Sequence, residues 1–306
     1  MKATPLFSFI MPAYKRQFLA KAIDSILAQT YDDFELVVVN DASPENLREV
    51  VADFDDQRLR YEENAENIGG RDLVANWNHC LQFAKGEYVI LATDDDVIET
   101  TYLEDAACLL KKYPDVDLLR QGVRKIGPNG EPLEYELFPK DHLTASEFAY
   151  YWGCCGLISC ISNFVFRREV LLAQGGFVSF PHAHYSDVAT ALAMSRNGVA
   201  CVQAYNLGFR MSDINLSNRG EWRLALEQLE ASRLFMQWVD SHLKMLGSDF
   251  FSRRAFYGFR EQYRYMVENL VNKIPVTKTA KVINALRRSG YLYKKEKLKI
   301  MLGFMV

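Results

Sequence analysis

Short apolar runs alternate with amphipathic segments through the first 120 residues, and this alternation constrains the fold more than any other feature. The apolar runs lack the period-2 pattern of a half-exposed strand, which is typical of a parallel sheet covered by helices on both faces. The sequence therefore predicts an α/β fold of this kind, followed by a helical C-terminal extension. The expected strands are the runs at 6–11, 34–39, 58–63, 87–92 and 116–120.

Small, turn-forming and acidic residues follow the first four expected strands. The carboxyl ends of parallel strands open on the same edge of a sheet, where α/β proteins bind their ligands. We therefore expect these residues to gather in one cleft. They are Pro12, Ala13 and Tyr14 after the first strand, Asn40 and Asp41 after the second, Asn67 and Arg71 after the third, and Asp94, Asp95 and Asp96 after the fourth.

The three adjacent aspartates are the most informative of these residues. One of them could simply cap the next helix. Capping does not explain three carboxylates that repel one another, whereas a hard divalent cation would relieve the repulsion. Such a cation keeps coordination positions open for the phosphates of a ligand. The run therefore predicts a metal site for Mg²⁺ or Mn²⁺ next to a bound diphosphate.

The segments "SFIMPAYKR", "FELVVVNDAS", "NIGG" and "GEYVILATDDD" together resemble family 2 glycosyltransferases, which are inverting enzymes of GT-A fold. The resemblance covers residues 5–120 strongly and residues 155–220 weakly. It implies transfer of a sugar from a nucleotide-diphosphate sugar, a UDP-sugar being favoured, to a hydroxyl of a glycan or lipid-linked acceptor. It also implies a Mg²⁺ or Mn²⁺ cofactor and a place in bacterial surface polysaccharide synthesis.

The resemblance also assigns nucleotide-sugar-binding residues. Asp41 matches the aspartate that accepts a base N–H group, as a carboxylate can because it only accepts hydrogen bonds. Asn40 stands where the family has a further aspartate. Asn76 and Asn78 lie in a segment that matches the family less well. The other residues matched to donor binding are Pro12, Ala13, Tyr14, Asn67, Arg71, Asp94 and Arg210.

For the metal, the resemblance places Asp95 at the position of direct contact, with Asp94 and Asp96 beside it. Thr93 occupies a place where the family usually has aspartate. Asp94 is assigned both to the ribose or nucleotide and to the metal, and Asp96 to the metal, to an ordered water or to a helix cap.

The predicted catalytic base is Asp187, which follows the glycine pair at 175–176 as the family's base does. An inverting transferase needs one carboxylate to take the proton of the attacking hydroxyl. The simpler alternative is that Asp187 only begins a helix. His182 and His184 lie nearby and are not predicted to be metal ligands. Ser212 stands where the family often has a histidine.

We expect two domains, a catalytic domain at 1–218 and a helical extension at 219–306. From residue 251 onward the sequence has 13 basic and 3 acidic residues, which gives this part a net charge of +10. Residues 1–250 therefore have a net charge of −13. The segment 278–302 mixes these basic residues with apolar ones. It is either a basic surface that contacts an anionic membrane or a subdomain that packs its apolar stripe on the protein. No nucleic-acid-binding motif accompanies the charge.

Several other classes are disfavoured. The cysteines form no C-x-x-C pair, so we expect reduced, buried thiols rather than a zinc site. The N-terminal apolar run is too short for a signal peptide, and no run approaches a membrane span. The expected location is therefore cytoplasmic, with peripheral contact at the inner face of the cell membrane. A sugar nucleotidyltransferase and a non-catalytic nucleotide-sugar-binding or scaffold protein are the alternatives.

Overall fold

The computed structural model describes residues 4–137, 139–211 and 222–305. The chain groups into two compact units. The expected domain boundary between residues 218 and 219 lies outside the described residues. The first unit comprises Met1–Ala145, Leu157–Val178 and Thr190–Ser212, and the second comprises Ser146–Gly156, Ser179–Ala189 and Asp213–Val306.

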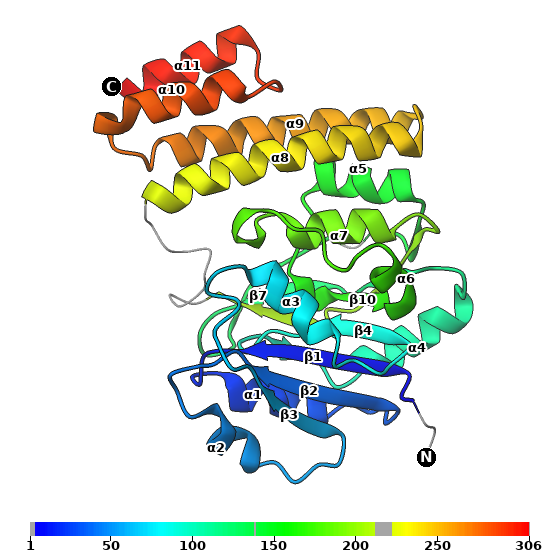
Figure 1. Cartoon of the computed structure of the whole chain (residues 1–306). Helices are drawn as coiled ribbons and strands as arrows, with labels where there is room; N and C mark the ends of the chain where they lie inside the picture. Colours follow the sequence, from blue (N-terminus) through cyan, green and yellow to red (C-terminus); the bar gives the residue numbers. More distant parts are fainter. Residues whose placement is uncertain (1–3, 138, 212–221, 306) are drawn as a thin grey trace. The chain divides into compact units, whose positions relative to one another are not determined.

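An eight-stranded sheet forms the centre of the first unit, in the order β3-β2-β1-β4-β10-β6-β11-β9 (Figure 1). The strands β1 to β4 are all parallel, whereas β10 is antiparallel to both of its neighbours. The predicted mostly parallel sheet is confirmed. Its strands are β1 (Phe7–Ala13), β2 (Phe34–Asn40), β3 (Leu59–Glu63), β4 (Tyr88–Leu91), β6 (Leu118–Arg120), β9 (His142–Leu143), β10 (Phe164–Arg167) and β11 (Val199–Cys201).

Helices cover both faces of this sheet. Phe7, Phe9 and Met11 of β1 point into one apolar core with residues of α1, α2 and α4, while α3 lies on the other side (Figure 1). Ile10 and Val37, which point to that other side, are also fully buried. Burial on both faces explains the continuous apolar runs in the sequence. The helices of this unit are α1 (Leu19–Leu27), α2 (Leu47–Ala52), α3 (Leu73–Leu81), α4 (Tyr102–Lys112) and α6 (Arg168–Ala173), and α7 (Ser186–Met194) is divided between the two units.

The strand order places a switch point between β1 and β4. The chain runs from β1 outward through β2 to β3, then returns to β4 on the opposite side of β1. In open α/β sheets, ligands bind in the crevice at such a point, outside the carboxyl ends of the strands. The segments that follow β1 and β4 therefore flank the expected crevice.

A second, four-stranded sheet has the order β5-β12-β7-β8. The turn at 127–132 joins two antiparallel strands, β7 and β8. The sequence did not predict that β12 would lie between β5 and β7, although this pairing brings Arg210 close to the aspartate run. The strands are β5 (Val97–Ile98), β7 (Val123–Ile126), β8 (Pro132–Tyr135) and β12 (Leu207–Arg210).

One buried ion pair fixes the chain after β8. The guanidinium of Arg120 donates to both carboxylate oxygens of Glu136, at 2.9 and 2.5 Å, and Glu136 also accepts from the backbone N–H groups of Val123 and Ile158. Both charged side chains are 1% exposed. A buried pair of this kind does not guarantee net stability, but losing one partner typically costs about 3–5 kcal/mol. It therefore specifies where the segment after β8 must lie.

The second unit is helical. Helices α8 and α9 lie side by side (Figure 1). Helices α5 and α9 approach closely, because a Cβ at Gly258 would lie 2.2 Å from the carbonyl oxygen of Gly153. Its elements are α5 (Ala145–Cys155), α8 (Trp222–Leu246), α9 (Phe250–Val271), α10 (Thr279–Arg288) and α11 (Lys294–Met305), with short 3-10 helices η2 (Pro181–Ala183) and η4 (Val276–Lys278); η1 (Ile161–Asn163) belongs to the first unit.

The cysteine expectation is wrong in one respect. Cys80, Cys160 and Cys201 are buried thiols, as expected, but three others are exposed. The apolar runs around these cysteines belong to helices, and a helix turns part of any such run toward solvent. None of the six forms a disulfide. The exposed cysteines are Cys108 on α4 and Cys154 and Cys155 at the end of α5.

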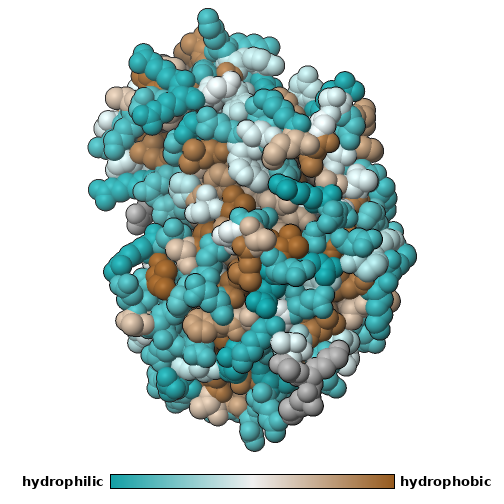
Figure 2. All heavy atoms as spheres, turned by 45° about the vertical axis from the view of Figure 1, so that its right-hand side comes forward, coloured by the Kyte–Doolittle hydropathy of each residue, from teal (hydrophilic) through white to brown (hydrophobic). Residues whose placement is uncertain are grey.

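No helix within the described ranges is both long and apolar enough to cross a membrane. On the face drawn in Figure 2, hydrophilic residues predominate and hydrophobic ones form small, separated groups. Scattered hydrophobic residues of this kind are ordinary on protein surfaces and do not mark a site by themselves.

Candidate functional site

The side chain of Asp94 joins the segments that follow β1 and β4. Its Oδ2 accepts hydrogen bonds from the backbone N–H groups of Tyr14 and Lys15, both at 2.9 Å. Asp94 is only 9% exposed, and hydrogen bonds to a charged group are strong in such surroundings. These bonds cross the switch point and fix the spacing of its two sides. Asp94 therefore has a positioning role, and its contact with a nucleotide stays a prediction.

Asp41, at the end of β2, organises the loop that follows β3. Its Oδ1 accepts from the N–H of Ile68 at 2.9 Å and from Nδ2 of Asn64 at 2.8 Å, and its Oδ2 accepts from the N–H of Gly69 at 2.8 Å. A Cβ at Gly69 would lie 2.9 Å from that Oδ2, so a side chain there would disturb the loop. A carboxylate that accepts three hydrogen bonds keeps a free lone pair. An N–H group of a nucleotide base could donate a hydrogen bond to it.

Two further donor-binding candidates lie on the same loop. Asn67 donates from Nδ2 to the carbonyl oxygen of Asp41 at 3.1 Å and accepts from the N–H of Gly70, which holds the tight turn. Arg71 is exposed and forms an ion pair with Glu66 at 3.0 Å. An exposed pair contributes about 0–1 kcal/mol, so the guanidinium could exchange this partner for a phosphate. Asn67 is thus structural, whereas Arg71 is available to a ligand.

The segment after β1 combines a fixed backbone with an exposed ring. Pro12 and Ala13 are the last residues of β1 and pair with β2. The ring of Tyr14 is 43% exposed, while its carbonyl oxygen accepts from Oγ of Ser43 at 2.6 Å. Asn40 accepts from the N–H of Ser43 at 2.9 Å, so this departure from the family pattern closes the turn after β2. An exposed aromatic ring on a fixed backbone suits stacking against a base.

Asp95 is the aspartate whose side chain the protein itself uses least. Its carboxylate lies 3.9 Å from Nζ of Lys15, in a pair that is partly exposed. Its backbone carbonyl oxygen accepts from Nε of Arg210 at 2.7 Å. The main chain at Asp95 is therefore held in place, and the side chain remains accessible to a ligand or a cation.

Asp96 is 3% exposed, and each of its carboxylate oxygens accepts a hydrogen bond, while its role as a metal ligand stays a prediction. Oδ1 accepts from the N–H of Arg210 at 3.0 Å, and Oδ2 accepts from Oγ of Ser162 at 3.3 Å. Arg210 is also buried; it donates to the carbonyl oxygen of Pro128 at 2.8 Å and stacks over the ring of Phe18. These contacts fix β12 against the aspartate run. The role of Arg210 in diphosphate binding stays a prediction, and Ser212 lies outside the described residues.

None of the three aspartates caps the following helix. Helix α4 begins at Tyr102 with Thr101 as N-cap, and strand β5 comes between the run and the helix. The capping alternative is therefore wrong, because the chain extends into a strand instead of turning into a helix.

Burial and the neighbouring charge of Asp95 raise the pKa values of Asp94 and Asp96. Burial is the main reason that the pKa of Asp94 lies above its usual value, the charge of Asp95 adds to the shift, and the amides of Tyr14 and Lys15 oppose it. Burial, again followed by the charge of Asp95, raises the pKa of Asp96 to about 7. A cation bound beside Asp95 would favour the charged forms of both neighbours.

The available oxygens fit a hard divalent cation that keeps coordination positions open. Among the described residues, no three or more His, Cys, Asp or Glu side chains converge on a possible metal position, since Asp96 is held by Arg210 and Ser162. Asp95 and the second carboxylate oxygen of Asp94 supply ligands of the type that Mg²⁺ and Mn²⁺ prefer. Two carboxylates do not form a complete cage, which suits an ion shared with a diphosphate.

In the second unit, Asp187 lies in the first turn of α7 and is half-buried. An acid in that turn stabilises the helix dipole, so the helix-start role and the predicted catalytic role are compatible. The preceding turn is strained, since His182, Ala183 and Tyr185 have φ values of 56°, 55° and 70°. Each left-handed non-glycine residue costs of order 1–3 kcal/mol, and such strain clusters at functional sites.

Contacts within the second unit hold this strained turn. The ring of Tyr185 stacks on Phe235 of α8 with centroids 4.3 Å apart, and His182 pairs with Glu227 of the same helix. Burial lowers the pKa of His184 to about 4, so this imidazole is neutral near pH 7, and its Nε2 has no hydrogen-bond partner among the described residues.

In the first unit, Asn78 anchors the chain that leads toward this turn. Its Oδ1 accepts from the N–H of Phe177 at 2.9 Å. Gly176 has a φ of 89°, and a Cβ there would lie 2.1 Å from the same Oδ1. The glycine thus allows both the left-handed backbone and the close approach of Asn78 from α3.

Sequence reasoning missed three residues of the site. Lys15 follows the assigned segment directly, so its charge at a strand end was a usable signal. Asn64, which bridges Asp41 and Asn76, lies just before the recognised loop. Ser162 is 66 residues from Asp96, and no local pattern indicates such a contact.

Comparison with known proteins identifies related sequences and folds. The family model described as "Glycosyl transferase family 2" matches residues 8–172, which is more than half of the chain. A relative from Escherichia coli K12, WcaA, whose name describes a glycosyl transferase of colanic acid biosynthesis, is 39% identical over 99 residues, 31% of this chain and 34% of that protein. The matched region therefore spans about a third of that relative's length.

Two solved structures share the fold. Residues 1–349 of Staphylococcus aureus TarS, in complex with UDP-GlcNAc, align with a TM-score of 0.64 at 18% identity, over 97% of this chain and 90% of that one. The mannosyltransferase PcManGT from Pyrobaculum calidifontis, in complex with GDP-Man and Mn²⁺, aligns with a TM-score of 0.57 at 17% identity, over 99% and 80% of the two chains. At these identities the likeness concerns the fold, and it bears out the expected GT-A architecture.

We predict that Asp96 makes the metal-free protein less stable as pH rises through about 7. Its folded pKa exceeds its unfolded value of 3.8, so between these values the native state holds a proton that the unfolded state has released. This stabilisation is fully present below the unfolded pKa and is lost above the folded one. Urea unfolding in EDTA at about pH 5.5 and about pH 8 measures the difference.

Asp96→Asn should flatten this pH dependence, because the amide does not titrate. Asp55→Asn, which replaces an exposed carboxylate in the same unit, should keep the wild-type dependence. If Asp96→Asn and wild type lose the same stability between the two pH values, Asp96 is not the titrating group.

Proposed function

The chain belongs to glycosyl transferase family 2, and on this premise we propose that it is an inverting glycosyltransferase. In this proposal it moves a sugar from a nucleotide-diphosphate sugar to a hydroxyl of a glycan or lipid-linked acceptor. Bacterial surface polysaccharide synthesis is the proposed setting, and the name of the relative WcaA supports it. Residues 1–218 are proposed as the catalytic domain and 219–306 as a helical extension.

The observation that carries the proposal is the arrangement at the switch point. Asp41 is buried beside a glycine loop, the ring of Tyr14 is exposed on a fixed backbone, and the carboxylate of Asp95 is accessible. A nucleotide base needs an acceptor for its N–H group and a surface on which to stack, and a diphosphate needs a site that neutralises its charge. A UDP-sugar is the favoured donor, and the UDP-GlcNAc held by TarS supports this choice.

We propose Mg²⁺ or Mn²⁺ as the cofactor, held by Asp95 and Asp94. The oxygen ligands of the site and the Mn²⁺ in the PcManGT complex support it. When bound, the cation would stabilise negative charge on the departing diphosphate. Asp94 would keep the two sides of the crevice at the required spacing through the amides of Tyr14 and Lys15, and Lys15 would add positive charge next to Asp95.

The proposed chemistry assigns the proton to Asp187. The acceptor hydroxyl oxygen forms a bond to C1 of the sugar while the bond from C1 to the diphosphate oxygen breaks on the opposite face. The hydroxyl proton passes to the Asp187 carboxylate, and the bonding electrons leave with the nucleoside diphosphate. The strained turn at His182, Ala183 and Tyr185 supports this role, because it holds the start of α7 in one conformation.

A non-catalytic nucleotide-sugar-binding or scaffold protein is the alternative from another class. It would bind the donor through the same switch-point residues without transferring the sugar. A sugar nucleotidyltransferase is less favoured. Such an enzyme is expected to have a glycine-rich phosphate loop after β1, and the segment at that place, "PAYKRQF", contains no glycine.

We also propose peripheral contact between segment 278–302 and an anionic membrane at the inner face of the cell. This segment has eight basic residues and one acidic residue, and the acidic one, Glu296, pairs with Arg260 inside the unit. On α11, Leu298 and Leu302 are 58% and 54% exposed, and Lys295 and Lys299 lie beside them along the same groove. A basic stripe with exposed leucines complements an anionic bilayer.

Asp187→Asn should lower kcat by about 10²–10⁴-fold, because the amide cannot take the proton of the acceptor. KM for the donor should stay near the wild-type value, since Asp187 is not assigned to donor binding. Steady-state transfer assays with a panel of UDP-sugars and glycan acceptors measure both constants. The matched control is Glu169→Gln, which changes an exposed acid in the first turn of α6.

Undiminished transfer by Asp187→Asn would remove the base assignment. Donor binding without transfer in the wild-type protein, over the whole panel, would favour the scaffold alternative.

Asp95→Asn should abolish the gain in UDP affinity that Mn²⁺ provides. We expect that gain to be about tenfold or more in wild type, the equivalent of about 1.4 kcal/mol. Isothermal titration calorimetry with UDP, in MnCl₂ and in EDTA, measures it. Asp55→Asn makes the same change at an exposed carboxylate and should keep the full Mn²⁺ effect. An equal Mn²⁺ effect in Asp95→Asn would contradict the metal assignment.

The double variant Lys295→Glu, Lys299→Glu should sediment less with vesicles of phosphatidylglycerol and phosphatidylcholine. Each lysine near an anionic surface contributes about 1 kcal/mol, so reversal of two should weaken binding more than tenfold. Lys21→Glu with Lys111→Glu reverses two exposed lysines of the first unit and serves as the matched control. Absence of wild-type binding to these vesicles would favour the packing role of the segment instead.

A further inference from the structure

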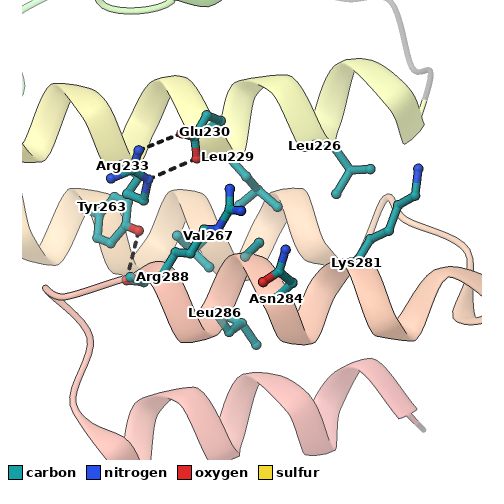
Figure 3. Close-up of a pocket in the computed structure, with 12 residues that line it drawn as sticks. Leu226, Leu229, Glu230, Arg233, Tyr263, Val267, Lys281, Asn284, Leu286 and Arg288 are labelled. Atoms are coloured by element: carbon teal, nitrogen blue, oxygen red, sulfur yellow. Dashed lines mark hydrogen bonds and ion pairs between the residues drawn. The ribbon is translucent and has the colours of Figure 1, made fainter.

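A cavity in the helical unit has the chemistry of a binding site that sugar transfer does not use. It lies between α8, α9 and α10 and has a volume of about 420 Å³ (Figure 3). That volume lies within the range of small-molecule sites, about 300–1,000 Å³. All of its lining residues belong to the second unit.

The floor of the cavity is apolar and well packed. Leu229, Val267 and Leu286 line it and are each 5% exposed or less. Leu226 lines the α8 side and is half-buried. At one end, the buried hydroxyl of Tyr263 donates to Oγ of Ser289 at 2.8 Å. The cavity therefore offers a hydrocarbon surface whose neighbouring polar groups already have partners.

The walls of the cavity are basic. Arg233, Lys281 and Arg288 line it together with a single carboxylate, Glu230, so the lining has an excess of two positive charges. Arg233 binds both oxygens of Glu230, at 2.9 and 2.6 Å. These hydrogen bonds are the main cause that lowers the pKa of Glu230, and they keep the carboxylate charged and neutralised.

Two of these cations, Lys281 and Arg288, are exposed and form no salt bridge among the described residues. The charge of Arg288 also contributes to the lowered pKa of Glu230, whose two carboxylate oxygens bind Arg233. Lys281 lies 5.3 Å above the ring of Trp222. Figure 3 shows Lys281, Asn284 and Arg288 extending from α10 toward α8, above the apolar floor. The cavity thus presents two exposed cations, which no carboxylate of the described residues binds directly, and an exposed amide next to buried leucines.

This combination selects an amphiphilic anion. A neutral hydrophobic ligand would leave the excess positive charge of the lining without an anion, and a nucleotide would place a polar base and ribose against leucine and valine. A phosphate accepts several hydrogen bonds at once and suits a guanidinium and an ammonium group together. An attached hydrocarbon chain would cover the floor, where each buried CH₂ contributes about 0.8 kcal/mol in general.

We propose that this cavity binds the phosphate group of a lipid, with Lys281 and Arg288 on the phosphate and the first carbons of the chain on the floor. The shared chemistry covers a lipid phosphate monoester and the phosphodiester headgroup of a membrane lipid. The inference rests on the proposed function only in that a lipid-linked acceptor would be one such molecule. Binding itself does not require sugar transfer.

The test is isothermal titration calorimetry of the full chain with soluble probes below their micelle concentrations and without nucleotide. Octyl phosphate should bind with a stoichiometry of one. Inorganic phosphate and octyl glucoside should each bind at least tenfold more weakly, because each offers only half of the required chemistry. Dihexanoyl phosphatidylglycerol distinguishes the sources: tighter binding than octyl phosphate assigns the cavity to a membrane lipid, and weaker binding assigns it to a phosphate monoester.

A pair of adjacent arginines provides the matched variants. Arg288→Ser should weaken octyl phosphate about tenfold or more, the loss expected for a hydrogen bond between charged groups. Arg287→Ser changes the neighbouring exposed arginine of α10, which does not line the cavity, and should bind like wild type. Leu226→Asn should weaken octyl phosphate more than ethyl phosphate. Urea unfolding of each variant shows whether the fold is kept.

Equal binding of octyl phosphate by Arg288→Ser and Arg287→Ser overturns the proposal, and so does wild-type binding no tighter than that of inorganic phosphate. Because no nucleotide is present, this result leaves the sugar-transfer proposal intact. Loss of transfer in Asp187→Asn, conversely, does not bear on the cavity.

Discussion

The candidate site depends on buried carboxylates that accept hydrogen bonds from backbone amides. Asp94 holds the N–H groups of Tyr14 and Lys15, and Asp41 holds those of Ile68 and Gly69. Four parallel strands only bring their ends to one edge; they do not fix the loops beyond. Charged acceptors do so because an unpaired buried carboxylate is costly, so each loop has one strongly favoured position. The crevice is therefore shaped before any ligand enters.

The three adjacent aspartates have different environments in the folded protein. Asp94 holds the backbone, Asp96 is occupied by Arg210 and Ser162, and Asp95 alone keeps an accessible carboxylate near Lys15. Burial, followed by the charge of Asp95, raises the pKa values of Asp94 and Asp96. A site in this condition gains from a cation, since a positive charge would favour all three ionised forms. The proposed cation would therefore offset the unfavourable burial and crowding of these carboxylates.

The helical unit has a different character from the sheet unit. Some of its basic residues form an exposed stripe on α11, and others line the cavity between α8, α9 and α10. Two of its acids pair within the unit, Glu230 with Arg233 and Glu296 with Arg260. The strained turn before Asp187 groups with this unit. Asp187, the proposed catalytic base, and the two surfaces proposed to contact lipid phosphates therefore belong to one compact unit.

The sequence by itself determined the elements whose signal is local. The apolar runs of β1 to β4 predicted a parallel sheet, and parallel strands necessarily place 12–14, Asp41 and the aspartate run on one edge. Only the tertiary structure decided that β10 enters between β4 and β6, that β12 holds Asp96, and that Asp95 keeps the accessible carboxylate. Those outcomes depend on contacts between residues up to 115 positions apart, whose energies arise from packing and from the pairing of buried charge, and no spacing within one segment encodes them.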